Sequence, residues 1–187
     1  IRRTITNKTK QNIVRLYKTL VRPHLEYCIQ AWRPHLQKDI NKLENVQRRA
    51  LKMIQGFNSI PYEERLKKTR LITLERRRTR ADLIEVFRIV NGIDKVAAED
   101  FFKFRSNTRS TRGHSKTIFK NQVRLNLRKF SFSQRIINEW NSLPEKAIQS
   151  NTINQFKSHI DPIMRKSGGQ YISPRLTAPL TRTTEDH

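Results

Sequence analysis

The sequence predicts a mainly α protein: a bundle of amphipathic helices, then a small α or α+β segment and a disordered tail. Apolar residues recur at helical spacing over several long stretches. Residues that start or stop helices lie at the ends of those stretches, and strand-like alternation is confined to one short region. We expect a helical domain over residues 1–104, a segment with a loop and two helices over 105–166, and the tail over 167–187.

The first helical stretch runs from Thr9 to Trp32. Its apolar residues recur every three or four positions, which places on one face Ile13, Leu16, Tyr17, Leu20 and Val21. Pro23 has no backbone N–H and crowds the preceding turn, so the sequence predicts a kink or a break into two helices there.

The clearest helix runs from about Leu36 to Gln55. One side is apolar and carries Leu36, Ile40, Leu43, Ala50, Leu51 and Ile54. The far side carries four cations within about 80° of one another at the α-helical period, namely Lys38, Lys42, Arg49 and Lys52. Gly56 follows where a left-handed C-cap belongs. We therefore expect an amphipathic helix with a cationic outer face.

Two further helices are expected before residue 97. Pro61 suits a first helical turn, which predicts a short helix over 61–68. Thr73 is a suitable N-cap for a long helix that ends near Asn91 and Gly92. Its apolar stripe consists of Leu83, Val86, Phe87 and Val90, and we expect Arg77, Arg78 and Arg88 to point away from that stripe. A short helical turn is expected over 97–102.

The pattern changes after residue 104. Residues 105–116 are polar and rich in arginine, and they predict a loop. Alternating apolar and polar residues between Thr117 and Leu127 favour two short strands. Helical spacing returns over 132–140, and a last helix begins near Thr152 and is disturbed by Pro162.

The charge balance points to a polyanionic partner. The chain has 39 Lys and Arg against 16 Asp and Glu, a formal net charge of +23. Such self-repulsion opposes folding unless an anion relieves it, and nucleic acid is the leading candidate, ahead of an anionic membrane surface. No apolar run approaches the about 20 residues of a membrane-spanning helix. A lone cysteine, Cys28, cannot form an internal disulfide; we expect an intracellular protein in which Cys28 is a buried small hydrophobe.

The residue types that catalysis requires are not clustered in the sequence. Two-metal polymerases and nucleases need grouped carboxylates, and this chain has no such pair of aspartates. Asp39, Glu44 and Asp82 are each expected to form ion pairs on helix surfaces. The five histidines and one cysteine have no zinc-like spacing. We therefore expect that the isolated chain is not an enzyme and binds no cofactor.

Several stretches together resemble one protein family. They are LYKTLVRPHLEYC at 16–28 with AW at 31–32, LENVQRRA at 43–50, TRGH at 111–114 and RIINEWNSLP at 135–144. In this order they resemble the C-terminal part of reverse transcriptases of non-LTR (LINE-type) retrotransposons, especially the chicken-repeat and jockey-like clades. The resemblance covers roughly residues 8–166.

The resemblance implies a longer parent polyprotein with an N-terminal apurinic-type endonuclease and a central RNA-directed DNA polymerase. That polymerase would need Mg²⁺, and neither catalytic centre lies in this chain. The chain would be the polymerase thumb, about residues 8–104, plus the family's C-terminal region. Its partners would be element RNA, the primer–template duplex of RNA and DNA, and the remainder of the polyprotein, in the cytoplasm and nucleus.

We expect the basic helix faces to contact phosphates. The first candidates are Lys38, Lys42, Arg49 and Lys52 on one helix with Arg77 and Arg78 on another, and the second are Arg105, Arg109 and Arg112 in the loop. The aromatic side chains of Tyr17, Trp32 and Trp140 could stack on bases, although core positions are favoured. Two alternatives stay open: a decayed or domesticated element fragment that serves as a protein-interaction or structural module, and a membrane-surface protein.

Overall fold

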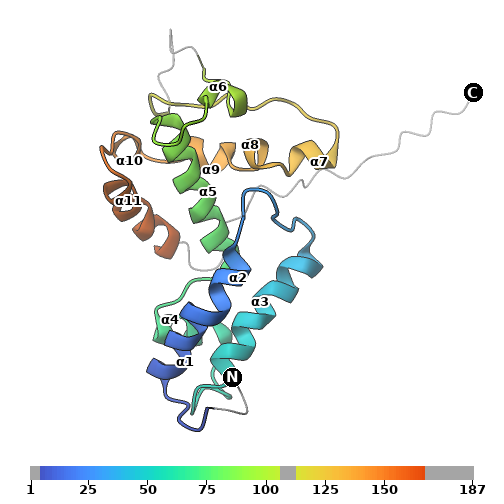
Figure 1. The fold of residues 1–187 in the computed structure, drawn as a ribbon, viewed down its shortest axis with the longest axis vertical. Coiled ribbons are helices and arrows are strands. Elements are labelled where there is room, and N and C mark those ends of the chain that lie inside the picture. The colour runs from blue at the N-terminus through green and yellow to red at the C-terminus, as the bar shows by residue number, and fades with distance from the viewer. Residues whose placement is uncertain (1–4, 106–112, 167–187) are drawn as a thin grey trace, which may run out of the picture.

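Helices dominate the computed structural model, which describes residues 5–105 and 113–166, so the predicted mainly α fold class is confirmed. The helices form two groups that meet at one long helix, α5, which spans Leu74–Val90 (Figure 1). The predicted disordered tail and two of the predicted loop contacts, Arg109 and Arg112, lie outside the described residues.

The N-terminal group packs around a small apolar core. Its elements are α1 (Lys10–Leu16), the π-helical turn η1 (Tyr17–Val21), α2 (Arg22–Glu26), α3 (Gln37–Lys52) and α4 (Tyr62–Thr69). The core consists of Ile13, Tyr17, Ala50, Leu51, Ile54, Leu66 and Leu71. These side chains come from the apolar faces of α1, η1, α3 and α4 and from the residues that directly follow α3 and α4. Helical periodicity therefore accounts for most of this core.

The predicted break near Pro23 is present as the turn η1. Proline cannot donate a backbone hydrogen bond, and the chain widens into a π turn just before it, with Arg22 N–H donating to the Tyr17 carbonyl. Pro23 then lies in the first turn of α2, where no donor is needed. The helix ends at Glu26 rather than at Trp32. Cys28 adopts a left-handed conformation with φ +50° and is exposed, so the prediction that it is buried was wrong.

The second group forms the larger core. α5 packs against α9 (Ile137–Asn141) and α11 (Ile153–Lys166) (Figure 1). The remaining short helices are α6 (Ala98–Phe101), α7 (Asn126–Lys129), α8 (Phe132–Arg135) and α10 (Glu145–Ile148). Residues 83–102 share one apolar core with residues 118–164, so the core does not divide near residue 104.

The prediction of two strands between residues 117 and 127 was wrong for this structure. One isolated antiparallel bridge joins Phe104 to Ile118, and α7 begins at Asn126. Ile118 is fully buried, and the side-chain amide of Asn141 accepts from its N–H at 2.9 Å and donates to its carbonyl at 2.8 Å. An amide side chain thus satisfies the backbone groups that a second strand would pair.

A buried polar network ties the N-terminal group to the start of α5. Gln47 accepts from the Tyr17 hydroxyl at 2.8 Å and donates to the Tyr62 hydroxyl at 2.8 Å. Glu44 accepts from that same Tyr62 hydroxyl and, at 2.9 Å, from the backbone N–H of Leu74, the first residue of α5. A carboxylate at this position also faces the positive end of the helix dipole. The prediction that Glu44 lies on the helix surface was therefore wrong.

Asp82, also expected on the surface, is fully buried between two arginines that come from other segments. Arg33 Nη1 lies 2.9 Å from Asp82 Oδ2, and Arg135 binds both carboxylate oxygens at 3.0 Å. Arg135 also donates to the carbonyl of Ile29 at 2.9 Å. One carboxylate on α5 therefore holds together the segment that follows α2 and the C-terminal end of α8.

We predict that Asp82→Asn lowers the free energy of unfolding by about 3–5 kcal/mol, because it leaves two half-buried guanidinium groups without an anion. Urea denaturation would measure this loss. The matched control is Asp161→Asn, which removes the partly exposed pair with Arg80 and should cost about 1 kcal/mol or less. Equal costs for the two variants would contradict the role assigned to Asp82.

A second prediction concerns alkaline pH. Burial raises the pKa of Tyr17 and Tyr62 above the ordinary value of 10.0, and the nearby carboxylates add to both effects. The folded chain therefore keeps these protons at a pH where the unfolded chain loses them, and stability falls as pH rises above about 10. The variant Y17F/Y62F should lose less stability between about pH 9 and pH 11 than the unmodified chain. Parallel slopes in urea titrations at each pH would contradict this prediction.

Candidate nucleic-acid interface

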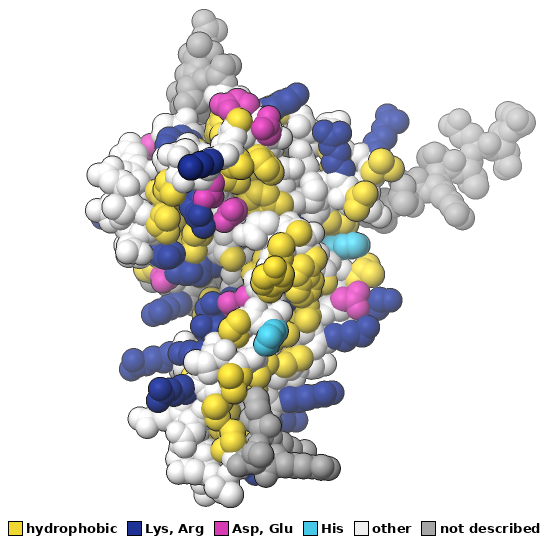
Figure 2. Space-filling view, viewed as in Figure 1, with side chains coloured by type: hydrophobic (Ala, Val, Ile, Leu, Met, Phe, Trp, Pro, Cys, Tyr) yellow, Lys and Arg dark blue, Asp and Glu magenta, His cyan; other side chains and the backbone are white. Residues whose placement is uncertain are grey.

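The four cations predicted on the third helical stretch lie together on the exposed face of α3. We call Lys38, Lys42, Arg49 and Lys52 the α3 stripe, and all four are exposed. The opposite face carries the buried residues Glu44, Gln47, Ala50 and Leu51, and this burial fixes which side meets solvent. The stripe extends along about 20 Å of helix. In Figure 2, Lys and Arg side chains project on both sides of a band of exposed apolar groups.

Few acids neutralise the α3 stripe. Lys42 pairs with Asp39 at 3.1 Å, as predicted for Asp39, but both side chains are well exposed and such a pair is weak. Within the described part of the chain, Lys38, Arg49 and Lys52 form no ion pair. The face therefore keeps most of its positive charge.

The C-terminal half of the α3 stripe borders a hollow of about 860 Å³. Its lining includes Arg49, Lys52 and Lys8, and none of the described residues that line it is acidic. Lys8 precedes α1, and the backbone N–H of Gln55 donates to its carbonyl at 3.1 Å, which anchors it beside the end of α3. No periodic pattern includes Lys8, so its position beside these cations could not be predicted from the sequence.

The prediction that Arg77 and Arg78 point into solvent was wrong. Arg77 forms a two-point pair with Glu26 of α2, with 2.9 Å between Nη2 and Oε2, and the hydrogen bonds to Glu26 raise the pKa of its guanidinium. Arg78 is only 2% exposed and donates to the Leu25 carbonyl at 2.9 Å. α2 and the segment after it cover this face of α5, and neither arginine joins the α3 stripe.

The other predicted contacts lie elsewhere. Arg105 is exposed in the second helical group, where its backbone N–H donates to the Thr117 carbonyl at 3.0 Å. Among the aromatic candidates, Tyr17 and Trp140 are buried in the two cores, as favoured. Trp32 is 41% exposed, so the core position favoured for it was wrong.

Two of the signature stretches, far apart in sequence, pack against each other. The His114 and Trp140 rings meet edge to face with centroids 5.7 Å apart. The Trp140 indole donates to the Lys116 carbonyl at 2.9 Å, and Glu145 accepts from the N–H and hydroxyl of Ser115 at 2.8 Å. The signature residues His114 and Trp140 therefore have structural roles, and together with Glu145 they hold the segment 114–118 in place.

Comparisons with known proteins leave the family open: no protein-family model, curated protein or solved structure matches this chain. None of the helices in residues 5–105 and 113–166 is both long and apolar enough to cross a membrane. The same residues contain no group of three or more His, Cys, Asp or Glu side chains arranged to hold a metal ion.

The burial of Arg78 yields a prediction that separates a structural from a binding role. Arg78→Gln should lower the free energy of unfolding by about 1–3 kcal/mol, because the Leu25 carbonyl loses a buried donor. The dependence of nucleic-acid affinity on salt should stay unchanged. Urea denaturation and salt-dependent fluorescence anisotropy would measure the two quantities. An unchanged stability together with a salt slope reduced by about one would instead identify a phosphate contact.

Proposed function

We propose that this chain is a non-catalytic, nucleic-acid-holding part of an RNA-directed DNA polymerase of the non-LTR retrotransposon kind. The α3 stripe carries the proposal: four exposed cations on one helix face with a single, exposed acidic partner. The net charge of +23 means that the chain as a whole has too few acids to neutralise its cations.

The α3 stripe suits binding that does not read sequence. Lys and Arg contacts to phosphate release condensed counterions, which supplies affinity for any polyphosphate backbone. A stripe of about 20 Å matches the axial length of about six base pairs. Phosphate contacts fix position without base readout, and a polymerase element that follows a growing RNA–DNA duplex needs this property.

The ordered sequence signatures support assigning this holding role to a polymerase. In this proposal the chain positions the primer–template duplex, and the remainder of the parent polyprotein supplies the Mg²⁺-dependent chemistry. Glu44, Gln47 and Trp140 belong to the signatures and are buried in the two packed groups. Such residues preserve the scaffold that presents the α3 stripe rather than contacting the ligand themselves.

The decisive experiment removes the α3 stripe. A variant with K38Q, K42Q, R49Q and K52Q should bind an RNA–DNA duplex more weakly, and the slope of log affinity against log salt should become shallower by about 3 to 4, since each phosphate contact contributes about 0.9. Fluorescence anisotropy over a range of salt concentrations would measure both changes.

The matched control carries the same loss of charge at other exposed lysines: K67Q, K95Q, K103Q and K146Q. It should retain most of the salt slope, because net charge alone does not make a contact. Equal effects of the two variants would contradict a localised interface on α3. No affinity for RNA or DNA at low salt would overturn the proposal as a whole.

A second candidate function is a protein-interaction module, and exposed apolar side chains favour it. Leu20 and Tyr27 beside α2, and Leu125 before α7, are more than half exposed. Concentration-dependent self-association, or binding to the remainder of the polyprotein that survives loss of the α3 stripe, would support this function.

A further inference from the structure

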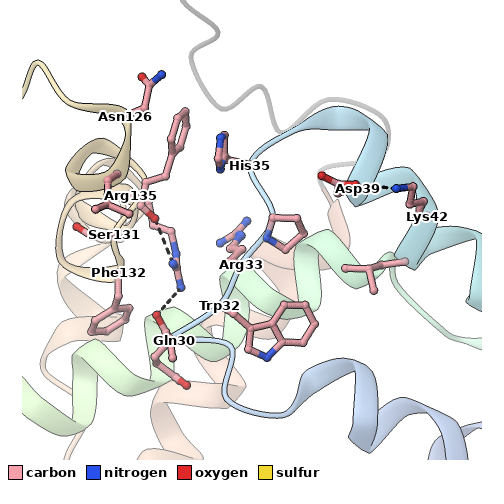
Figure 3. A pocket seen from close by; sticks show the side chains of 15 residues that line it. Gln30, Trp32, Arg33, His35, Asp39, Lys42, Asn126, Ser131, Phe132 and Arg135 are labelled. Atoms are coloured by element: carbon pink, nitrogen blue, oxygen red, sulfur yellow. Dashed lines mark hydrogen bonds and ion pairs between the residues drawn. The ribbon is translucent and has the colours of Figure 1, made fainter.

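A groove opens at the N-terminal end of the α3 stripe. It lies between the segment 30–35, the first turns of α3, and α7 with the start of α8, and it encloses about 700 Å³ (Figure 3). Its walls come from residues nearly a hundred positions apart in the chain, so no local sequence pattern predicts it.

Aromatic rings line this groove. The rings of His35 and Phe130, which come from opposite walls, stack directly on each other with centroids 4.2 Å apart and an angle of 12° between their planes. Trp32 contributes a ring that is 41% exposed, and Phe132 lies buried at the wall. Flat π surfaces that remain open to solvent are the groups on which unpaired bases stack.

The Trp32 ring is held in place before any ligand arrives. Its indole N–H donates to the Tyr27 carbonyl at 2.7 Å. The guanidinium of Arg78 lies over the ring at 5.5 Å from its centroid. A ring fixed by two contacts loses little conformational freedom when a base stacks on it.

The polar groups of the groove also suit a nucleotide. Lys42 lines the groove and pairs with Asp39, whereas the side chains of Arg33 and Arg135, which also line it, are paired with the buried Asp82. The residues Gln30 and Asn126, which carry side-chain amides, also line the groove. Amides of this kind can bond to base edges, while Lys42 attracts the phosphates, because its pair with Asp39 is exposed and weak.

Lys42 belongs both to the α3 stripe and to the groove, so a backbone that follows the α3 stripe leads into the aromatic rings. We propose that the groove binds unpaired nucleotides of a single strand that continues from a duplex held on the α3 stripe. This inference rests on the proposed function and adds a distinct ligand, a nucleobase, to the phosphate contacts.

The test compares three RNA–DNA duplexes: one blunt, one with a single-stranded overhang, and one with an abasic overhang of the same length. The base-containing overhang should raise affinity about fivefold or more over the abasic one, as expected for one stacked base. The blunt duplex reports on the α3 stripe alone. If none of the three duplexes binds, the proposed function fails. If the duplexes with base-containing and abasic overhangs bind equally well, only the proposal that the groove binds nucleotides is overturned.

Intrinsic fluorescence gives a second readout in the unmodified chain. Of the two tryptophans, Trp140 is fully buried and Trp32 is exposed, so a stacked base should quench Trp32. We expect quenching by the base-containing overhang and little by the abasic one. Equal quenching by both would overturn the proposal, and this measurement does not depend on the folding of any variant.

The variants complete the test. Trp32→Ala should abolish the preference for the base-containing overhang, whereas Trp32→Phe should keep part of it. Tyr27→Ala removes an aromatic ring that is 76% exposed but does not line the groove, and it should leave the preference intact. An equal loss of this preference in Trp32→Ala and Tyr27→Ala would overturn the assignment of the groove to nucleotides. Self-association that protects Trp32 from quenching would also overturn it and would favour a protein partner.

Discussion

The buried carboxylate of Asp82 is the constraint on which the arrangement of the two helical groups depends. A desolvated carboxylate is costly unless cations and hydrogen bonds surround it, and here Arg33 and Arg135 supply both. Arg33 lies in the segment that enters α3, and Arg135 closes α8. The carboxylate thereby sets the distance between the two walls of the aromatic groove.

The same arrangement explains why only some of the basic side chains lie on the exposed cationic surface. Arg77 and Arg78 of α5 and Arg135 of α8 are bound by internal acids or carbonyls, whereas the four cations of the α3 stripe face solvent. A high net charge by itself does not distinguish these two populations. The exposed population is the one available to a polyphosphate, because its charges have not already been matched inside the fold.

The sequence predicted helix ends well where capping residues next to the helix mark them. Thr73 does accept a hydrogen bond from the N–H of Arg76 at 3.4 Å as the N-cap of α5, and Gly56 takes the left-handed conformation after α3. The α3 stripe was predictable too, because helical periodicity places its members on one face.

Partners that are distant in sequence could not be predicted in this way. Glu44 contacts Leu74, and Asp82 contacts Arg135, so nothing in the neighbouring residues marks either acid as buried. A polar residue on an amphipathic helix is ordinarily assigned to the surface. The positions of Lys8 in the hollow and Trp32 in the groove could not be predicted for the same reason, because residues distant in sequence form their surroundings.

The position of α5 has a consequence for how the chain unfolds. Its first residue is bonded to Glu44 in the N-terminal group, and its later turns contribute Leu83, Val86 and Phe87 to the other core. Neither group can melt without disturbing a helix that the other requires, so the two cores should behave as one cooperative unit despite their separate apolar contents. A shortened chain that ends after α6 would leave the apolar flank of α5 uncovered, and it would be prone to aggregate.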